Sequence, residues 1–250
     1  MLPLSGFAMC LLAILSRVAE DAPLILAANR EEEYARGGTP PQLIEDKVRF
    51  VAGTDPRAGG TWFGVSEHGL VAAVTNGHKN GSREAVRSRG LLVKDLLGCR
   101  TAAEAARHAA LEVTTGKYAP CNLLCADLDM VYVVRSAAWV QVLPLPAGIH
   151  VLTKGGLTST ADPRVRRALT WLEGKQMPTS RMWLELARRM CADAEDEDGG
   201  AICVSGSRGG TVSSTLLALR RPVRSSTLLH AQGPPSVTPY ADMSFLLRFE

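Results

Sequence analysis

The sequence predicts an α+β fold in which helices cover antiparallel sheet, and three observations carry that prediction. Short apolar runs of strand length recur along the 250 residues. Short polar or Gly/Pro turns join many of these runs, which favours antiparallel meanders because parallel strands need long crossover connections. Helical periodicity is confined to separate blocks between the strands. The composition, 46% hydrophobic and 21% charged, is that of a globular protein with a sizeable core.

Strands are predicted where four to eight apolar residues lie between turn signals. Polar turns at 127–129 and 135–137 connect neighbouring runs in the middle of the chain, as in a meander. The predicted strands are residues 9–15, 23–28, 70–75, 122–126, 130–134, 139–143, 149–153, 201–204, 211–219, 227–231 and 243–249.

Apolar residues recur at the helical period in four blocks, and each block has a recognisable start. The blocks are 89–97, 102–113, 163–172 and 181–192. Capping side chains precede three of them: Thr101, Asp162, and either Ser180 or Thr179. A proline stands at the first position of the third block, where its missing N–H costs nothing.

The charge balance and the first segment narrow the classes of partner. Lys and Arg number 28 against 25 Asp and Glu, too even for a nucleic-acid footprint or a polybasic membrane anchor. The apolar core at 7–15 is about half of the roughly 20 residues that span a membrane. No basic residue precedes it, as one would in a signal peptide. We therefore expect no nucleic-acid binding, no stable membrane insertion and, with scattered reduced cysteines, a cytoplasmic location.

No motif indicates a cofactor or a metal. The chain has no GxxxxGK[ST], and no GxGxxG follows a strand. Cys121 and Cys125 lack a second ligand pair at zinc spacing and fit core thiols better. The acidic run 193–198 lacks the alternating ligands of an EF-hand, so we expect a solvated loop there.

Cys10 is the sharpest candidate for chemistry. It lies at the start of the first predicted strand, and the polar cluster Asn-Arg-Glu-Glu at 29–32 ends the next one. A cysteine at a chain terminus carries its own base, because an α-amino group with a pKa near 8 can take the thiol proton. Met9 is a second possible translation start. Removal of that methionine would leave Cys10 as the first residue. From residue type alone, one more buried thiol is the commoner interpretation.

Other polar features are candidates for completing a site. Asn76 follows a predicted strand, where its amide could donate to an oxyanion, although Asn-Gly is equally a hairpin signal. Arg89, with Arg83 and Arg87, could receive a carboxylate or phosphate at a helix start, or could be solvated.

Two further features have both structural and functional interpretations. The glycine-rich turns at 58–64 and 209–215 allow a backbone to approach a ligand or another strand closely. His150 lies in an apolar strand pattern, where a hydrogen-bonded core histidine is commoner than a catalytic one.

The order of these motifs resembles the NRDE family, also called transport and Golgi organisation 2. The resemblance runs from Met9 to about Thr215. It rests on Ala-Ala-Asn-Arg-x-Glu at 27–32 followed by Ala-Gly-Gly-Thr-Trp-x-Gly at 58–64. Further matching segments are 75–76, 88–90, 122–124 and 210–216.

The resemblance implies the N-terminal-nucleophile hydrolase fold, a four-layer αββα sandwich of two antiparallel sheets. Similar amidases, the penicillin V and bile-salt acylases, use an N-terminal cysteine as nucleophile and base. Carried over to this chain, Cys10 is the nucleophile and Arg30 the partner of its thiolate. Glu31 is the acid that orients the amine, and Asn76 is the oxyanion donor. The expected substrate-binding residues are Asn29, Trp62, Arg89, His150 and Ser213.

Three polar positions depart from the family pattern. Glu31 stands where the family has Asp, and the longer side chain displaces the carboxylate that must meet the terminal amine. Lys154 stands where the family has Asn. Val212 replaces an Arg, for which Arg208 is a candidate substitute.

We therefore expect one domain over residues 10–250, with 1–9 as a propeptide or an extension from an upstream start. The function hypothesis is an N-terminal cysteine amide hydrolase that acts on a small acylated metabolite. The alternative, which the resemblance also suggests, is non-enzymatic binding or trafficking of haem, acyl-CoA or lipid. Both hypotheses imply a small-molecule partner, and neither specifies an oligomeric state.

Overall fold

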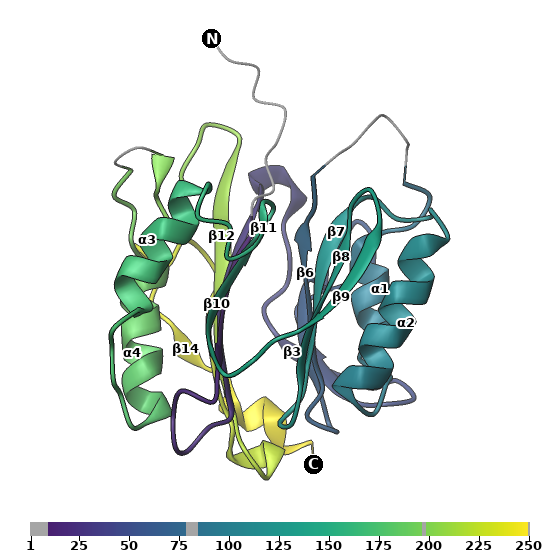
Figure 1. The fold of residues 1–250 in the computed structure, drawn as a ribbon, viewed down its shortest axis with the longest axis horizontal. Helices are drawn as coiled ribbons and strands as arrows, with labels where there is room; N and C mark the ends of the chain where they lie inside the picture. Colours follow the sequence, from purple (N-terminus) through teal and green to yellow (C-terminus); the bar gives the residue numbers. More distant parts are fainter. Residues whose placement is uncertain (1–9, 79–84, 197–198, 250) are drawn as a thin grey trace.

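The computed structural model describes residues 10–78, 85–196 and 199–249, so the predicted extension at 1–9 lies outside the described residues. Two antiparallel sheets pack face to face, and a pair of helices covers the outer face of each (Figure 1). This arrangement is the four-layer αββα sandwich that the family resemblance implied. In the described part of the chain, no helix is long and apolar enough to cross a membrane.

The first sheet contains the strands that carry most of the candidate residues. Its order is β11-β10-β1-β2-β12-β13-β14, and all of its pairings are antiparallel. The strands are β1 (Leu11–Ser16), β2 (Leu24–Glu33), β10 (Gly148–Thr153), β11 (Gly156–Leu157), β12 (Gly209–Leu219), β13 (Thr227–Ala231) and β14 (Ala241–Asp242).

The second sheet is a meander in strict sequence order, from β3 to β9. Its strands are β3 (Gln42–Ile44), β4 (Phe50–Ala52), β5 (Phe63–Ser66), β6 (Val71–Asn76), β7 (Cys121–Ala126), β8 (Val131–Ser136) and β9 (Val140–Pro144).

The four predicted helices are confirmed within one or two residues at each end. They are α1 (Arg89–Leu96), α2 (Ala102–Thr114), α3 (Pro163–Leu172) and α4 (Ser180–Cys191). Side chains of Ser88, Thr101 and Asp162 accept bonds from backbone N–H groups in the first turns of α1, α2 and α3. For α4, Thr179 is the N-cap but makes no such side-chain bond.

Side-chain alternation along the strands divides the apolar residues among three cores. In β1, Leu11, Ala13 and Leu15 face α3 and α4, while Leu12 and Ile14 enter the layer between the sheets. A third core lies between the second sheet and α1 and α2. By the same alternation, Cys10 faces the layer between the sheets.

Two predicted strands are wrong. Residues 201–204 form no named strand because side chains and a loop use their backbone: Asn29 donates to the Ile202 carbonyl, and the Ile202 and Cys203 N–H groups donate to Asp193 O. Residues 243–249 contain instead the 3₁₀ turn Ser244–Arg248.

The hairpin interpretation of Asn76-Gly77 is also wrong. Strands β6 and β7 do pair, but the chain passes through α1 and α2 between them, and the Gly77 N–H donates to the Pro120 carbonyl. Short edge strands β3, β11 and β14 and the strands β4 and β5 were not predicted, since runs of two to four residues carry little periodicity.

Gly60 fixes the start of α1 against the second sheet, and its substitution tests this contact. A Cβ at Gly60 would lie 2.3 Å from the Gly90 carbonyl carbon, and neighbouring Thr61 donates its N–H to the Gly90 carbonyl. We expect Gly60→Ala to lower the free energy of unfolding by about 1–3 kcal/mol in urea denaturation. Gly155→Ala, with its nearest non-neighbour atom at 3.4 Å, should change it by less than about 0.5 kcal/mol. Equal effects would contradict the packing role of Gly60.

Candidate functional site

A cleft at one end of the layer between the sheets brings together candidates from both sheets. Cys10 enters it directly before β1, and the β1–β2 register, with Leu11 opposite Asn29, places Cys10 beside Arg30 on the same face. The cleft has a volume of about 90 Å³. Its lining residues are Cys10, Arg30, Glu31, Glu32, Arg36, Asp55, Thr61, Trp62, Val74, Asn76, Ser88, Arg89 and Gly90.

A second, smaller cavity continues from Cys10 into the layer between the sheets. It has a volume of about 20 Å³, which is room for about one water molecule. Cys10, Arg30, Trp62 and Val74 line both spaces. The other lining residues of the inner cavity are mostly apolar: Leu11, Leu12, Ala28, Asn29, Phe63, Ala73, Thr75, Ser213 and Thr215. Cys10 thus lies where a polar mouth meets an apolar interior.

The surroundings of Cys10 hold its thiol in the protonated form. Burial raises the pKa of the Cys10 thiol to about 12, and the negative charge of Glu31 adds to the rise. The Arg30 guanidinium opposes it and lowers the thiol pKa. The Cys10 Sγ lies 3.9 Å from the Glu31 carbonyl oxygen, to which it can donate a weak bond. A nucleophilic role therefore requires a base that removes the thiol proton during the reaction.

Arg30 is fixed by three contacts at the mouth of the cleft. Its guanidinium stacks on Trp62, with 4.0 Å from Cζ to the ring centroid, and donates to the Gly37 carbonyl at 2.9 Å. Its Nη2 also lies 3.8 Å from Glu32 Oε2. Arg30 is only 7% exposed, so its charge acts on Cys10 with little screening by solvent.

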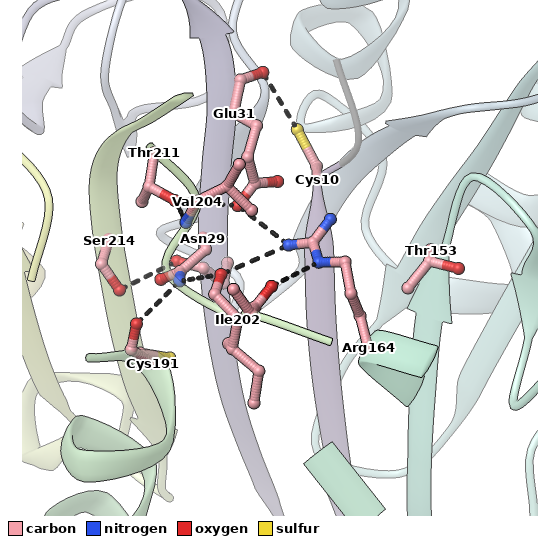
Figure 2. Close-up of polar contacts among 12 residues, drawn as sticks. Cys10, Asn29, Glu31, Thr153, Arg164, Cys191, Ile202, Val204, Thr211 and Ser214 are labelled. Atoms are coloured by element: carbon pink, nitrogen blue, oxygen red, sulfur yellow. Dashed lines mark hydrogen bonds and ion pairs between the residues drawn. The ribbon is translucent and has the colours of Figure 1, made fainter. Parts of the chain in front are cut away.

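Glu31 and Asn29 point to the opposite face of the sheet from Arg30. Glu31 Oε1 lies 3.2 Å from Arg164 Nη2 and accepts a bond from Thr211 at 3.2 Å. Figure 2 shows these three side chains. The Asn29 amide donates to the carbonyls of Cys191 and Ile202 at 2.9 and 3.0 Å. These contacts bind β2 to α3, to the end of α4 and to the 201–204 segment. Asn29 also appears among the residues that line the inner cavity.

The sequence reasoning missed Arg164 as the partner of Glu31. Arg164 is buried in the first turn of α3, where its positive charge opposes the helix dipole. An arginine in the first turn of a predicted helix is unfavourable, and this was the sequence signal that could have identified Arg164. Arg208, the candidate substitute for the family arginine, has an exposed side chain. Val212 occupies an irregular position in β12, between Thr211 and Ser213.

Asn76 and Arg89 reach the cleft from the second sheet and from α1. Asn76 ends β6, and its carbonyl accepts from the Asn122 amide at 3.3 Å. The Asn122 amide also lies 3.0 Å from the Thr153 carbonyl and so joins the two sheets, a role that the sequence reasoning missed. Arg89 donates to the Pro120 carbonyl at 3.0 Å.

Ser213, His150 and Lys154 lie in different parts of the first sheet and its connections. Ser213 lines the inner cavity. His150 lies opposite Ile14, well along β1 from Cys10, and its Nε2 lies 3.0 Å from the Pro146 carbonyl. It lines neither of the two cavities at Cys10. Lys154 follows directly after β10.

The sequence also drew attention to two arginines before α1 and to two cysteines of β7. Arg87 pairs with Asp95 and bonds Tyr118, whereas Arg83 lies outside the described residues. Cys121 and Cys125 are buried thiols of the core, as predicted. Within residues 10–78, 85–196 and 199–249, no group of three or more His, Cys, Asp or Glu side chains is placed to hold a metal ion.

The buried Glu31 carboxyl gives a measurable pH dependence. Burial raises the pKa of Glu31 to about 7, although Arg164 and Thr211 act against the rise. Between pH 4.5 and 7 the folded chain therefore holds a proton that the unfolded chain has released. Relative to Glu31→Gln, the wild-type free energy of unfolding should fall by up to about 3 kcal/mol over this range.

Urea unfolding of both proteins at closely spaced pH values measures this difference. Glu20→Gln, at an exposed position, serves as the control and should run parallel to the wild type. Parallel profiles for wild type and Glu31→Gln would show that the Glu31 carboxyl is not held in its protonated form.

Comparisons with known proteins identify the family of this chain. The family model of Transport and Golgi organisation 2 matches residues 9–188. The mouse and human Transport and Golgi organization 2 homologues are each 38% identical over 77 residues, a segment that covers 30% of this chain and 28% of each relative.

Solved structures with little sequence identity share the fold. An N-acylethanolamine-hydrolyzing acid amidase ortholog of Caenorhabditis elegans superposes with a TM-score of 0.57 at 12% identity, covering 84% of this chain and 92% of that one. A conjugated bile acid hydrolase of Clostridium perfringens, in a mutant form, gives 0.50 at 11% identity, with 94% and 92% covered. The family and fold predicted from the motifs are confirmed: this chain belongs to the Transport and Golgi organisation 2 family and has the N-terminal-nucleophile hydrolase fold.

Proposed function

We propose that the protein is a cysteine amide hydrolase that cleaves small N-acyl compounds once Cys10 is its first residue. One observation carries the proposal: the Cys10 thiol lies where a polar cleft with Arg30 and Asn76 meets an apolar cavity. The apolar side suits an acyl chain, and the polar side suits the departing amine. The solved relatives named as amidase and hydrolase support the choice of an amide bond.

The reaction needs a base that the intact Met9-Cys10 peptide bond does not supply. Because burial raises the pKa of the Cys10 thiol to about 12, nearly all of the thiol is protonated at pH 7. A free α-amine on Cys10 takes the thiol proton as Sγ attacks the carbonyl carbon. The carbonyl electron pair moves onto oxygen, where the Asn76 amide can donate a hydrogen bond.

The tetrahedral intermediate then collapses in the direction that breaks the C–N bond. The α-ammonium of Cys10 gives its proton to the leaving nitrogen, and the acyl group remains on Sγ as a thioester. Water attacks the thioester with the α-amine as base, which releases the carboxylic acid and restores the thiol. In this scheme Arg30 lowers the cost of negative charge on sulfur, and Trp62 holds Arg30 in place.

Hydrolysis should depend on exposure of the Cys10 amine. We compare the 250-residue chain with a chain that starts at Met9 and loses that methionine, each verified by intact mass. Only the chain with Cys10 first should hydrolyse a panel of N-acylethanolamines, N-acylglycines and acyl-aminocoumarins. Cys10→Ala should lower the rate by at least about 10³-fold, and brief reaction should add one acyl mass to the active chain. Equal hydrolysis by a chain that retains residues 1–9 would refute the mechanism.

The effect of Arg30 on the thiol can be measured without any substrate. In the chain that starts at Cys10, Arg30→Gln should slow alkylation of Cys10 by iodoacetamide at pH 8 at least about threefold, because less thiolate is present. Peptide mass spectrometry reports the rate at Cys10 alone. Arg49→Gln, which removes an ion pair with Glu67 outside the cleft, should leave the rate unchanged. An unchanged rate in Arg30→Gln would mean that Arg30 does not act on the thiol.

A further inference from the structure

Ser213 places a hydroxyl without a hydrogen-bond partner in the cavity beside Cys10. The residue is 2% exposed and lines the inner cavity. Its Oγ is buried, and no atom of the described residues bonds it. A buried hydroxyl without a partner costs free energy, so the position is unfavourable for the protein alone. A ligand oxygen in the cavity would supply the missing bond.

A bulge in β12 turns Ser213 toward this cavity. Thr211 pairs with Glu31 and Ser213 pairs with Arg30, so the register shifts by one residue between them, at Val212. Residues two apart in a regular strand share a face, yet Thr211 bonds Glu31 on the helix side while Ser213 lies on the cavity side. Bulges of this kind re-aim side chains and are frequent beside active sites.

The next hydroxyl on the same face is already engaged. Thr215 Oγ1 lies 2.9 Å from His230 Nδ1, and His230 Nε2 lies 2.8 Å from the side-chain oxygen of Gln232. Thr215 therefore has its partner inside the protein, and Ser213 is the hydroxyl left open along this wall. The facing second sheet contributes Phe63, Ala73 and Thr75, and the Thr75 hydroxyl already accepts a bond from the Asn122 amide.

We propose that Ser213 binds a hydroxyl or keto oxygen on the acyl chain of the substrate. The proposal rests on the proposed function and specifies its acyl group. Cys10 and Ser213 flank Arg30 on adjacent strands of one sheet, so their backbones lie about 10 Å apart. The recognised oxygen is thus several bonds from the carbonyl that Cys10 attacks. A neutral oxygen fits because the charge of Arg30, which lines this cavity, is already engaged by Trp62, the Gly37 carbonyl and Glu32.

The acyl chain enters only if the cavity widens, because the present space holds about one water. A third space between the sheets shares three lining residues with this inner cavity: Trp62, Phe63 and Thr215. Rotation of the Phe63 ring would join the two spaces and would leave the Arg30–Trp62 stack in place.

Binding tests the proposal independently of hydrolysis. The probes are N-methylamides of octanoic acid, of 3-, 4- and 5-hydroxyoctanoic acid and of 5-oxooctanoic acid, titrated into Cys10→Ala protein and followed by NMR shifts. At least one oxygenated amide should bind about tenfold more tightly than the octanoyl amide, as one hydrogen bond supplies. Ser213→Ala in the same background should abolish that preference. Ser214→Ala should keep it, because Ser214 lies on the other face, where it donates to the Ala28 carbonyl and accepts from Tyr240.

Thermal stability separates ligand recognition from a structural role. Ser213→Ala removes an unpaired buried hydroxyl and should raise Tm by a few degrees, whereas Ser214→Ala removes two bonds and should lower it. A lower Tm in Ser213→Ala, or an oxygen preference that survives it, overturns the proposal. Equal affinity for all five amides, or no binding, also overturns it, as expected if Ser213 holds only a water molecule. If the proposed hydrolytic function is wrong, the chain that starts at Cys10 will show no turnover, while the binding preference remains intact.

Discussion

The alternation of side chains along β2 is the constraint on which the rest of the site depends. Asn29 and Glu31 face the helices, and Arg30 between them faces the cleft. The two outward residues attach the strand to α3, α4 and the 201–204 segment through buried bonds. Because a strand cannot rotate one residue without its neighbours, those attachments also fix the direction of Arg30 and the position of Cys10 beside it.

Charge is distributed unequally between the two faces of this strand. On the helix side, the Glu31 carboxyl meets a buried guanidinium, and its second oxygen lacks a partner among the described residues. On the cleft side, Arg30 is balanced by the nearby Glu32 and by the aromatic face of Trp62. The thiol of Cys10 lies between these arrangements and is kept neutral by burial. In the proposed mechanism, an exposed α-amine on Cys10 supplies the acceptor for the thiol proton.

The sequence predicted the elements with strong local signals and missed those set by distant contacts. Helices with an N-cap side chain, such as α2 and α3, were placed almost to the residue, because capping and periodicity are local. Strands β3 to β5 were missed since their pairing, rather than their composition, defines them. The motif around Cys10 and Arg30 was visible in the sequence. Arg164, the bulge at Val212 and the bridging Asn122 were not, because each depends on segments far apart in the chain.

The pairing of β12 with β2 after the bulge at Val212, rather than residue identity, determines which serine faces the cavity. Ser213 and Ser214 are chemically identical neighbours, yet one faces the cavity and the other the helices. Because Thr211 pairs with Glu31 and Ser213 with Arg30, removing Val212 would leave a continuous register in which each serine keeps its face. The bulge is therefore a position where the length of β12 can change by one residue without altering the proposed binding wall.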